Sequence, residues 1–398
     1  MDADGQVVAG GVEVSAVIPC LNEERTLGAC IEKAQRYFAA HGIAGQVVVA
    51  DNGSTDHSIG IALKLHAKVV REPRKGYGAA LMAGFEAADG ELIVMADADG
   101  SYDWEAIGPF VEKLREGYDL VLGNRFKGGI RKGAMPALHR YLGNPVLSFL
   151  GRLASRTPLG DFHCGMRGLT KSAYRSTRPR TTGMEFATEM IMAAAKQGLR
   201  IAEVPTVLYP DGRGRPPHLR SFRDGWRHLR FMMTCAPDYL YAVPGVLLLV
   251  AGVLLQALLF AGPVSLNGFT LGIHFVALGG LLSLLGVNIL SLGVLAKLTI
   301  AHMYPNLSSR TARWMLTRFR LEWGLLAGAA VFALGALIDL AILARWLSTR
   351  GPIDETVHAA FVATTMMVVG LSTVFCSFLF NLFVLDHERS RLDGGARQ

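Results

Sequence analysis

Four long apolar segments in the second half of the chain constrain its fold more than any other feature. A helix needs about 20 predominantly apolar residues to cross the hydrocarbon core of a bilayer. Each segment reaches that length and is apolar all round, whereas a helix on a soluble core is apolar on one side only. The sequence therefore predicts four transmembrane helices, at 239–262, 273–301, 323–346 and 361–385.

The connections between these segments predict their orientation. The connection between the second and third holds Arg310, Arg313, Arg318 and Arg320, whereas PVSLN, between the first and second, holds no charge. Basic connections remain on the cytoplasmic side. The first residues, MDADGQVVAGG, lack the basic and then apolar order of a secretory signal. We therefore expect a multi-pass protein of the inner (plasma) membrane, with both termini and the part before residue 239 in the cytoplasm.

The chain before residue 239 alternates between short apolar runs and helical patterns. The runs predict strands at 12–19, 46–51, 68–73, 91–97 and 119–125, and the patterns between them predict helices at 24–41, 77–88 and 104–116. Such alternation indicates a largely parallel sheet with helices on both faces. Ligands bind beyond the carboxyl ends of strands in such sheets. Polar clusters lie at those ends: PCLNEE (19–24), DNGSTD (51–56), DADGSYD (97–103) and GNRFKGG (123–129).

Composition argues against several other classes of protein. The five cysteines have no Cys-x-x-Cys spacing and no histidine cluster, so neither a disulfide framework nor a zinc site is expected. The formal net charge of +7 does not indicate nucleic-acid binding without a matching motif.

Asp97 and Asp99 stand one residue apart directly after an apolar strand. Two carboxylates held so close resist ionising together unless a cation neutralises them. Mg²⁺ and Mn²⁺ prefer oxygen ligands and bind substrate phosphates as well. A bare Asp-x-Asp pair can also be a solvated acidic loop, but its place among the other strand-end clusters favours a metal-bridged diphosphate.

The motifs VSAVIPCLNEE, ADNGSTD and MADADGSYD, in this order, resemble family-two glycosyltransferases of the GT-A fold. GNRFKGG, DFHCGMRGLT, MEFATEM and EVPTVLYPDGRGR resemble the dolichol- or polyprenyl-phosphate sugar synthase branch, which includes dolichyl-phosphate mannosyltransferases. The resemblance implies an α/β GT-A (Rossmann-like) cytosolic domain followed by an α-helical membrane domain of four transmembrane helices. The expected parts are a flexible N-terminus (1–11), the GT-A domain (12–217), an amphipathic interfacial helix (218–235), the transmembrane domain (236–386) and a cytosolic tail (387–398).

The resemblance also implies a nucleotide-sugar donor, a UDP- or GDP-hexose, bound with Mg²⁺ or Mn²⁺. Asp97 would help to hold donor and metal, and Asp99 would be a direct metal ligand. Many relatives have a further metal-binding Gln where this chain has Gly100 and Ser101, so Ser101 or water would substitute. The remaining residues expected at the donor are Pro19, Asn22, Glu23, Asp51, Lys75 and Arg213.

Two of these donor assignments leave alternatives open. The glycines beside Lys75, in KGYGAA, either place amides and lysine near phosphate or permit close strand–helix packing. Relatives carry a Gly-x-Ser-Lys element that closes over the diphosphate. This chain has GRGRPPHLR there, which makes Arg213, Arg215 and His218 candidates.

Arg125, Arg140 and Asn144 match the positions at which the family grips the acceptor phosphate. They precede the apolar stretch PVLSFLGRL (145–153), which could lie on a membrane; the alternative for each arginine is an exposed surface charge. Asp161 and Arg167 match the family's D…GxR motif, either as a structural ion pair or as substrate contacts. Glu185 likewise either lies near the sugar or has a structural role.

Residues 218–233 predict an amphipathic basic helix. Its apolar stripe is Leu219, Phe222, Trp226, Leu229 and Met233, and its basic stripe is Arg220, Arg223, Arg227 and Arg230. Such a helix lies in the headgroup plane of a membrane; the alternative is a helix packed on the sheet with a solvated arginine face. We assign no chemistry to Asp339 in the third span.

These inferences predict an inverting, metal-dependent hexosyltransferase. It would move one hexose, glucose or mannose, from the nucleotide sugar to polyprenyl phosphate on the cytosolic membrane face. The acceptor phosphate, with a second pKa near 6, is already an anion at neutral pH and needs no protein base. The alternatives are a membrane glycosyltransferase with a hydroxyl acceptor (a glycolipid or polysaccharide synthase) and a non-catalytic membrane scaffold with a degenerate transferase domain. A homo-oligomer is compatible with the sequence.

Overall fold

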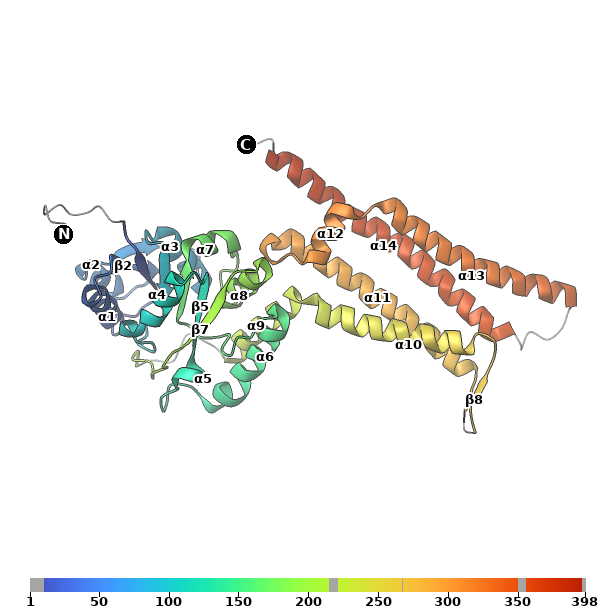
Figure 1. Cartoon of the computed structure of the whole chain (residues 1–398), viewed down its shortest axis with the longest axis horizontal. Helices are drawn as coiled ribbons and strands as arrows, with labels where there is room; N and C mark the ends of the chain where they lie inside the picture. Colours follow the sequence, from blue (N-terminus) through green and yellow to red (C-terminus); the bar gives the residue numbers. More distant parts are fainter. Residues whose placement is uncertain (1–10, 215–220, 267, 350–355, 396–398) are drawn as a thin grey trace. The chain divides into compact units, whose positions relative to one another are not determined.

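The computed structural model describes residues 11–214, 221–266, 268–349 and 356–395. Most of the predicted flexible N-terminus, and the candidates Arg215 and His218, lie outside these residues. The chain divides into an α/β unit, Met1–Met232, and a membrane unit, Met233–Gln398. In Figure 1 the α/β unit runs from blue to green, and the long helices of the membrane unit run from yellow to red.

The α/β unit contains a seven-stranded sheet in the order β3-β2-β1-β4-β6-β5-β7. The strands are β1 (Val14–Cys20), β2 (Gly45–Asp51), β3 (Lys68–Arg71), β4 (Leu92–Met95), β5 (Leu120–Asn124), β6 (Arg167–Thr170) and β7 (Ile201–Pro205). Only β6 runs antiparallel to its neighbours. The prediction of a largely parallel sheet is confirmed, but β6 and β7 were not among the predicted strands.

Helices cover both faces of this sheet, as predicted. On one face Ala16 and Ile18 of β1 pack with residues of α1 (Leu27–Ala40) and α4 (Gly108–Arg115). On the other face Val17 packs with α3 (Tyr77–Ala87) and α8 (Phe186–Gln197). This alternation along β1 follows from the two-residue period of side chains on a strand. Two further short helices are α2 (Ser58–Lys64) and α7 (Lys171–Thr177).

The helix predicted at 104–116 is divided. A 3₁₀ turn, η1 (Trp104–Ala106), precedes α4, and Pro109 lies in the first turn of α4. Proline is tolerated there because the first N–H groups of a helix have no intrahelical partner.

Three helical elements lie between β5 and β6. They are α5 (Arg125–Gly128), the π-helical turn η2 (His139–Gly143) and α6 (Asn144–Ser155). The helix α9 (Ser221–Cys235) lies where an amphipathic helix was predicted. Leu219 and Arg220 fall outside the described residues, and the Phe222 side chain is not described.

Helix α9 packs on α8 through one side and is exposed on another. His228 of α9 is buried, and its Nδ1 lies 2.9 Å from the Thr188 hydroxyl of α8. Arg227 forms an ion pair with Glu185 at 3.6 Å. Trp226 and Met233, by contrast, are 58% and 40% exposed. The structure therefore shows contact between α9 and α8 together with exposed apolar side chains, and the position of α9 in the headgroup plane stays a prediction.

The membrane unit has four helices long and apolar enough to cross a membrane, as predicted: Asp238–Leu259, Ile273–Met303, Leu321–Thr349 and Val357–His387. Its elements are η3 (Asp238–Ala242), α10 (Val243–Leu259), β8 (Val264–Leu266), β9 (Phe269–Leu271), α11 (Ile273–Met303), η4 (Pro305–Leu307), α12 (Arg310–Arg318), α13 (Leu321–Thr349) and α14 (Val357–Gly395). Helix α14 continues into the segment predicted as a tail.

Glycines allow the membrane helices to approach one another closely. A Cβ on Gly286 of α11 would lie 2.5 Å from the Leu249 nitrogen of α10, and a Cβ on Gly370 of α14 would lie 2.6 Å from the Gly328 oxygen of α13. Inside a bilayer the hydrophobic effect does not drive helices together. Association depends instead on close van der Waals packing, which small residues permit.

A polar contact joins α10 to α14 inside this apolar unit. Gln256 Nε2 donates to Thr365 Oγ1 at 2.9 Å, and both side chains are buried. Gly280 of α11 leaves room for the pair, because a Cβ there would lie 2.8 Å from Thr365 Oγ1.

We predict that Gly286→Leu destabilises the membrane unit. The added side chain must force α10 and α11 apart, and overpacking of this kind costs about 1–3 kcal/mol. The melting temperature of the full chain in detergent should fall. Ala330→Leu adds similar volume to an exposed position of α13 and serves as the control. Equal melting temperatures for the two variants would contradict a tight α10–α11 crossing.

Candidate active site

The polar loops that follow β1, β2 and β4 meet at one edge of the sheet. The register pairs Cys20 of β1 with Asp51 of β2, and β1 also pairs in parallel with β4. The residues after these strands are therefore neighbours, as the sequence predicted for parallel strands.

Hydrogen bonds fasten the first two loops to each other. Asp51 is buried and accepts the N–H groups of Gly53 (3.1 Å) and Ser54 (3.0 Å). Asn22, with a left-handed φ of 58°, accepts the Thr55 N–H at 2.7 Å and donates its own N–H to Ser54 Oγ at 2.9 Å. Pro19 lies buried in β1 beside this pair of loops. These contacts join the loop of Asn22 to the loop that follows Asp51, and the role of these residues at a donor stays a prediction.

Lys75 reaches back to the same loops. Its Nζ donates to the Asn52 carbonyl at 2.9 Å, while Asn52 Oδ1 accepts the Gly76 N–H at 2.8 Å. A Cβ on Gly76 would lie 2.1 Å from the Thr182 oxygen, and one on Gly78 would lie 2.5 Å from the Thr181 oxygen. Close packing therefore requires these two glycines, which was one of the two interpretations of KGYGAA.

Asp97 and Asp99 follow β4, and each has a defined partner. Asp97 Oδ1 accepts from the Tyr77 hydroxyl at 3.0 Å, and Asp99 Oδ1 accepts from the Ser101 N–H at 2.9 Å. Gly100, between Asp99 and Ser101, has a φ of 76°, which favours glycine. Burial, and then the nearby charge of Asp99, raise the pKa of Asp97 to about 6.

The Arg213 guanidinium supplies a positive charge to this carboxylate pair. Its Nη2 lies 2.7 Å from Asp99 Oδ2, and its Nη1 lies 3.4 Å from Glu23 Oε1. The backbone holds this segment in place, because the Gly212 N–H donates to the Asp99 carbonyl at 2.8 Å and the Tyr209 N–H donates to the Ser101 carbonyl at 2.9 Å. The structure thus joins Glu23, Asp99 and Arg213 in one charged cluster.

The residues at this cluster fit a divalent cation that shares its coordination with a ligand. Asp97, Asp99 and Ser101 offer only oxygen atoms, the donors that Mg²⁺ and Mn²⁺ prefer. A cation would offset the burial and the repulsion by Asp99 that raise the pKa of Asp97. Among the described residues, no group of three or more His, Cys, Asp or Glu side chains could hold a metal alone. Water or a substrate phosphate would have to complete the coordination.

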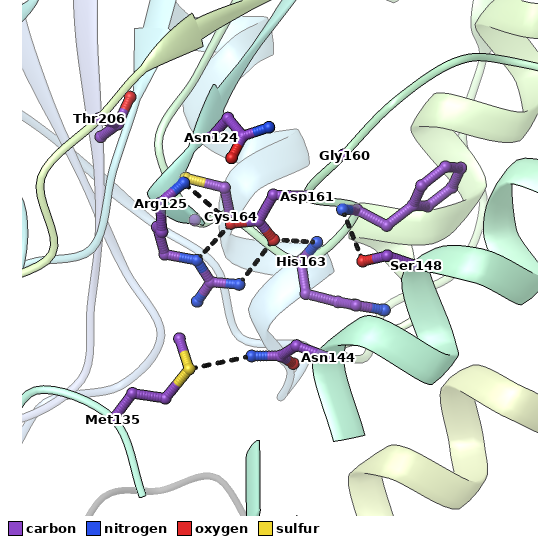
Figure 2. A network of polar contacts seen from close by, with 12 residues as sticks. Asn124, Arg125, Met135, Asn144, Ser148, Gly160, Asp161, His163, Cys164 and Thr206 are labelled. Atoms are coloured by element: carbon purple, nitrogen blue, oxygen red, sulfur yellow. Dashed lines mark hydrogen bonds and ion pairs between the residues drawn. The ribbon is translucent and has the colours of Figure 1, made fainter. Parts of the chain in front are cut away.

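A second charged cluster follows β5. Arg125 donates to both carboxylate oxygens of Asp161, from Nε to Oδ2 at 2.6 Å and from Nη2 to Oδ1 at 2.8 Å, and its backbone N–H adds a third bond at 3.1 Å. Arg125 is 7% exposed and Asp161 is fully buried. Figure 2 shows the remaining guanidinium nitrogen of Arg125 directed away from the carboxylate.

Asp161 therefore pairs with Arg125 rather than with Arg167, the partner considered from the D…GxR motif. Arg167 is fully buried and donates instead to the backbone carbonyls of Cys164 (3.0 Å), Phe162 (3.1 Å) and Ala187. Glu185, also left open, pairs with Arg227 of α9.

Glu203 of β7 supports the second cluster and was assigned no role from the sequence. Its carboxylate accepts the N–H groups of Gly160 (2.6 Å) and Asp161 (3.0 Å) through Oε1, and Oε2 accepts from Asn124 Nδ2 at 3.1 Å. Lys127 adds an ion pair at 3.2 Å. A carboxylate inside the otherwise apolar strand EVP was the sequence signal that could have indicated this role.

His163 was also not identified from the sequence. Its backbone N–H donates to Asp161 Oδ1 at 3.2 Å. Its ring contacts the His228 ring edge to face, with the two centroids 4.8 Å apart. Burial lowers the pKa of His163 well below 6.5, and the neighbouring His228 lowers it further. His163 is therefore neutral at physiological pH.

Arg140 and Asn144 lie on η2 and at the start of α6. Asn144 Nδ2 lies 3.4 Å from Met135 Sδ, a contact drawn as a dashed line in Figure 2. The half-buried Arg140 lies over the Tyr141 ring at 5.5 Å. Among the described residues, no hydrogen bond joins Arg140 or Asn144 to Arg125.

Comparison with known proteins gives two family matches. Residues 15–178 match the model of "Glycosyl transferase family 2", and residues 294–384 match "Glycosyltransferase family 2 C-terminal transmembrane region".

Individual proteins are similar over different extents. The "Low-salt glycan biosynthesis hexosyltransferase Agl6" of Haloferax volcanii is 37% identical over 92% of this chain and 88% of its own length. A "Dolichyl-phosphate hexose transferase" of the same organism is 31% identical over 48% of this chain and 81% of its own. A solved structure of glucosyl-3-phosphoglycerate synthase from Mycobacterium tuberculosis with Mn²⁺ and UDP-glucose covers 56% of this chain and 77% of its own, at 22% identity and a TM-score of 0.43.

We predict strong coupling between Arg125 and Asp161 in stability. Removing one partner of a buried ion pair costs about 3–5 kcal/mol, because the other charge remains buried without compensation. Arg125→Met and Asp161→Leu should each lower the melting temperature of the α/β unit by roughly 6–20 °C.

The double variant Arg125→Met/Asp161→Leu should lose less stability than the sum of the losses in the two single variants. Asp89→Asn, which removes one partner of the exposed Lys68–Asp89 pair, is the control and should change stability by at most about 1 kcal/mol. Additive single losses would mean that the two side chains act independently.

Proposed function

Because the chain belongs to glycosyltransferase family 2, we propose that it transfers one hexose, with inversion, from a nucleotide diphosphate sugar to polyprenyl phosphate. The relatives' names support a hexose, and the acceptor and donor are our proposal. Glucose and mannose are the sugars expected, carried on UDP or GDP.

The observation that carries the proposal is an exposed apolar face on η2 and α6. Six large apolar side chains, each at least 39% exposed, recur here at helical spacing: Leu138, Tyr141, Leu142, Val146, Phe149 and Leu153. A patch of this kind on a water-soluble domain marks an interaction surface. Arg140 and Asn144 lie in the same short segment. A surface that enters a membrane beside candidate phosphate ligands suits a lipid phosphate as acceptor.

The charged cluster around Asp99 suits the donor. We assign Asp97, Asp99 and Ser101 to a divalent cation, Mg²⁺ or Mn²⁺, which when bound would neutralise the negative charge of the leaving diphosphate. Pro19, Asn22, Glu23 and Asp51 would face the base and ribose. Lys75 and Arg213 would face the diphosphate. Arg213 must then leave Asp99 Oδ2, and its charge becomes available to the phosphates.

The proposed reaction is a single displacement at the anomeric carbon. An oxygen of the acceptor phosphate forms a bond to that carbon while the bond to the nucleoside diphosphate breaks on the opposite face. The acceptor phosphate is already an anion at neutral pH, so no proton has to be removed by the protein. Accordingly we assign no general base. The protein holds two anionic substrates in line and stabilises the charge of the leaving group.

The membrane unit supports the placement of the reaction at a bilayer. The basic connection that contains Arg310, Arg313 and Arg318 indicates that this end of the four helices faces the cytoplasm. We therefore propose that the α/β unit and both termini are cytoplasmic, where nucleotide sugars are available.

Arg125, held by Asp161, would offer its outward nitrogen to the acceptor phosphate together with Arg140 and Asn144.

We predict that Asp99→Asn lowers transfer about 100-fold or more at saturating Mn²⁺, since it weakens stabilisation of the leaving charge. The measurement is transfer of radiolabelled hexose from the nucleotide sugar to polyprenyl phosphate. Asp103→Asn, in the same loop but paired with Lys33 at the surface, is the control and should stay near wild-type activity. Near-normal transfer by a folded Asp99→Asn protein would refute the assignment of Asp99.

We also predict that Arg140→Ala selectively weakens acceptor use. Loss of a charge-assisted hydrogen bond costs about 1.5–3 kcal/mol, so the KM for polyprenyl phosphate should rise roughly 10- to 100-fold. The KM for the donor should change less than twofold. Lys132→Ala, an exposed cation in the preceding segment, is the matched control.

Acceptor chemistry gives an independent test. The wild-type enzyme should not glycosylate polyprenol, which lacks the phosphate. Efficient transfer to polyprenol or to a sugar hydroxyl, with Arg140→Ala unimpaired, would favour a hydroxyl-directed membrane glycosyltransferase. A folded protein that neither binds nor turns over any nucleotide sugar would favour a non-catalytic scaffold.

A further inference from the structure

The short helix α12 connects two membrane-spanning helices and has no role in the proposed reaction. Two residues separate Arg318, at its end, from Leu321, where α13 begins. An extended chain spans at most about 3.6 Å per residue, so the end of α12 lies within about 11 Å of α13. At its other end η4 joins it to α11. These short connections confine α12 to the membrane surface.

The contacts of its inner face place α12 at the level of the lipid headgroups. Ala312 and Leu316 are buried against Leu298 and Ala301 of α11, in a cluster that α14 completes with two partly buried phenylalanines. The residue before Leu298 is Lys297, which forms an ion pair with Asp238, the first residue of the first span. Charged side chains lie at the ends of membrane-spanning helices rather than within the hydrocarbon. Helix α12 therefore packs just beyond the hydrocarbon boundary.

The outer face of α12 is positively charged and exposed. Arg310, Arg313, Trp314 and Arg318 occupy it, with the Trp314 side chain 60% exposed. Their spacing of three and four residues places them on one side of the helix, opposite Ala312 and Leu316. The sequence from Tyr304 to Leu321 contains no aspartate or glutamate, so no carboxylate of this segment balances the arginines.

We propose that this outer face binds the headgroups of anionic phospholipids in the adjoining leaflet. A guanidinium matches two phosphate oxygens at once, and a tryptophan favours the boundary between headgroup and hydrocarbon. Each arginine near an anionic surface strengthens binding about fivefold. Because the inner face fixes α12 to α11 and α14, the three arginines are presented together. The proposal requires only the membrane unit and does not rest on the transfer reaction.

Lipid retention by the full-length protein tests the proposal. Protein equilibrated with equal amounts of phosphatidylglycerol and phosphatidylcholine is released into the gas phase, and the bound lipids are counted by native mass spectrometry. Wild-type protein should retain phosphatidylglycerol in preference, and R310Q/R313Q/R318Q should reduce that preference at least tenfold. The control K64Q/R71Q/R175Q removes the same charge from exposed positions of the α/β unit and should keep the preference for phosphatidylglycerol.

A second measurement uses wild-type protein alone and is therefore independent of how the variants fold. A phosphatidylglycerol analogue with a photoreactive headgroup should label the peptide that contains residues 310–318. The proposal is overturned by equal retention of the two lipids in wild-type protein, by equal losses in the two triple variants, or by labelling confined to other segments.

Discussion

The cost of burying charge governs how the loops of the α/β unit are arranged. Asp161 is fully buried, and it is stable there because Arg125 contributes three N–H donors to it. Glu203 fixes the backbone that presents Asp161, and Arg213 neutralises Asp99. An isolated buried charge would cost several kcal/mol. The segments after β4 and β5 are therefore each held by an ion pair with a residue distant in the sequence, which fixes their geometry.

Sequence patterns predicted the strands and helices, whose formation depends on residues close together in the chain. The five predicted strands and all four spans are confirmed because side-chain periodicity and segment length are local properties. Strand β6, with the sequence RGLT, was missed because four residues with arginine and glycine carry no strand pattern. The partner of Asp161 could not be predicted either, since Arg125 lies 36 residues away and Arg167 stood nearer in a familiar motif. Glu203 acts through partners 42 and 79 residues away, and the ring of His163 contacts that of His228 on α9.

The family membership expected from the motifs is confirmed, and the geometry adds detail that motifs do not contain. The resemblance implied a phosphate-binding Arg125, whereas the structure shows an arginine already committed to a carboxylate through Nε and Nη2. An arginine held in this way loses little side-chain entropy when it meets a ligand. If the proposed function holds, the pair serves both folding and acceptor binding. A variant of Arg125 would then change both at once, so Arg140 is the better residue for testing acceptor binding alone.

The contact between Gln256 and Thr365 has a consequence for how the protein is made. The two residues are 109 positions apart. At a synthesis rate of about 5–20 residues per second, Gln256 emerges roughly 5–20 s before its partner. A primary amide facing hydrocarbon without a partner is costly. The hairpin of α10 and α11 therefore either waits beside the translocation machinery or keeps Gln256 hydrated until α14 arrives, so α14 completes the burial of α10.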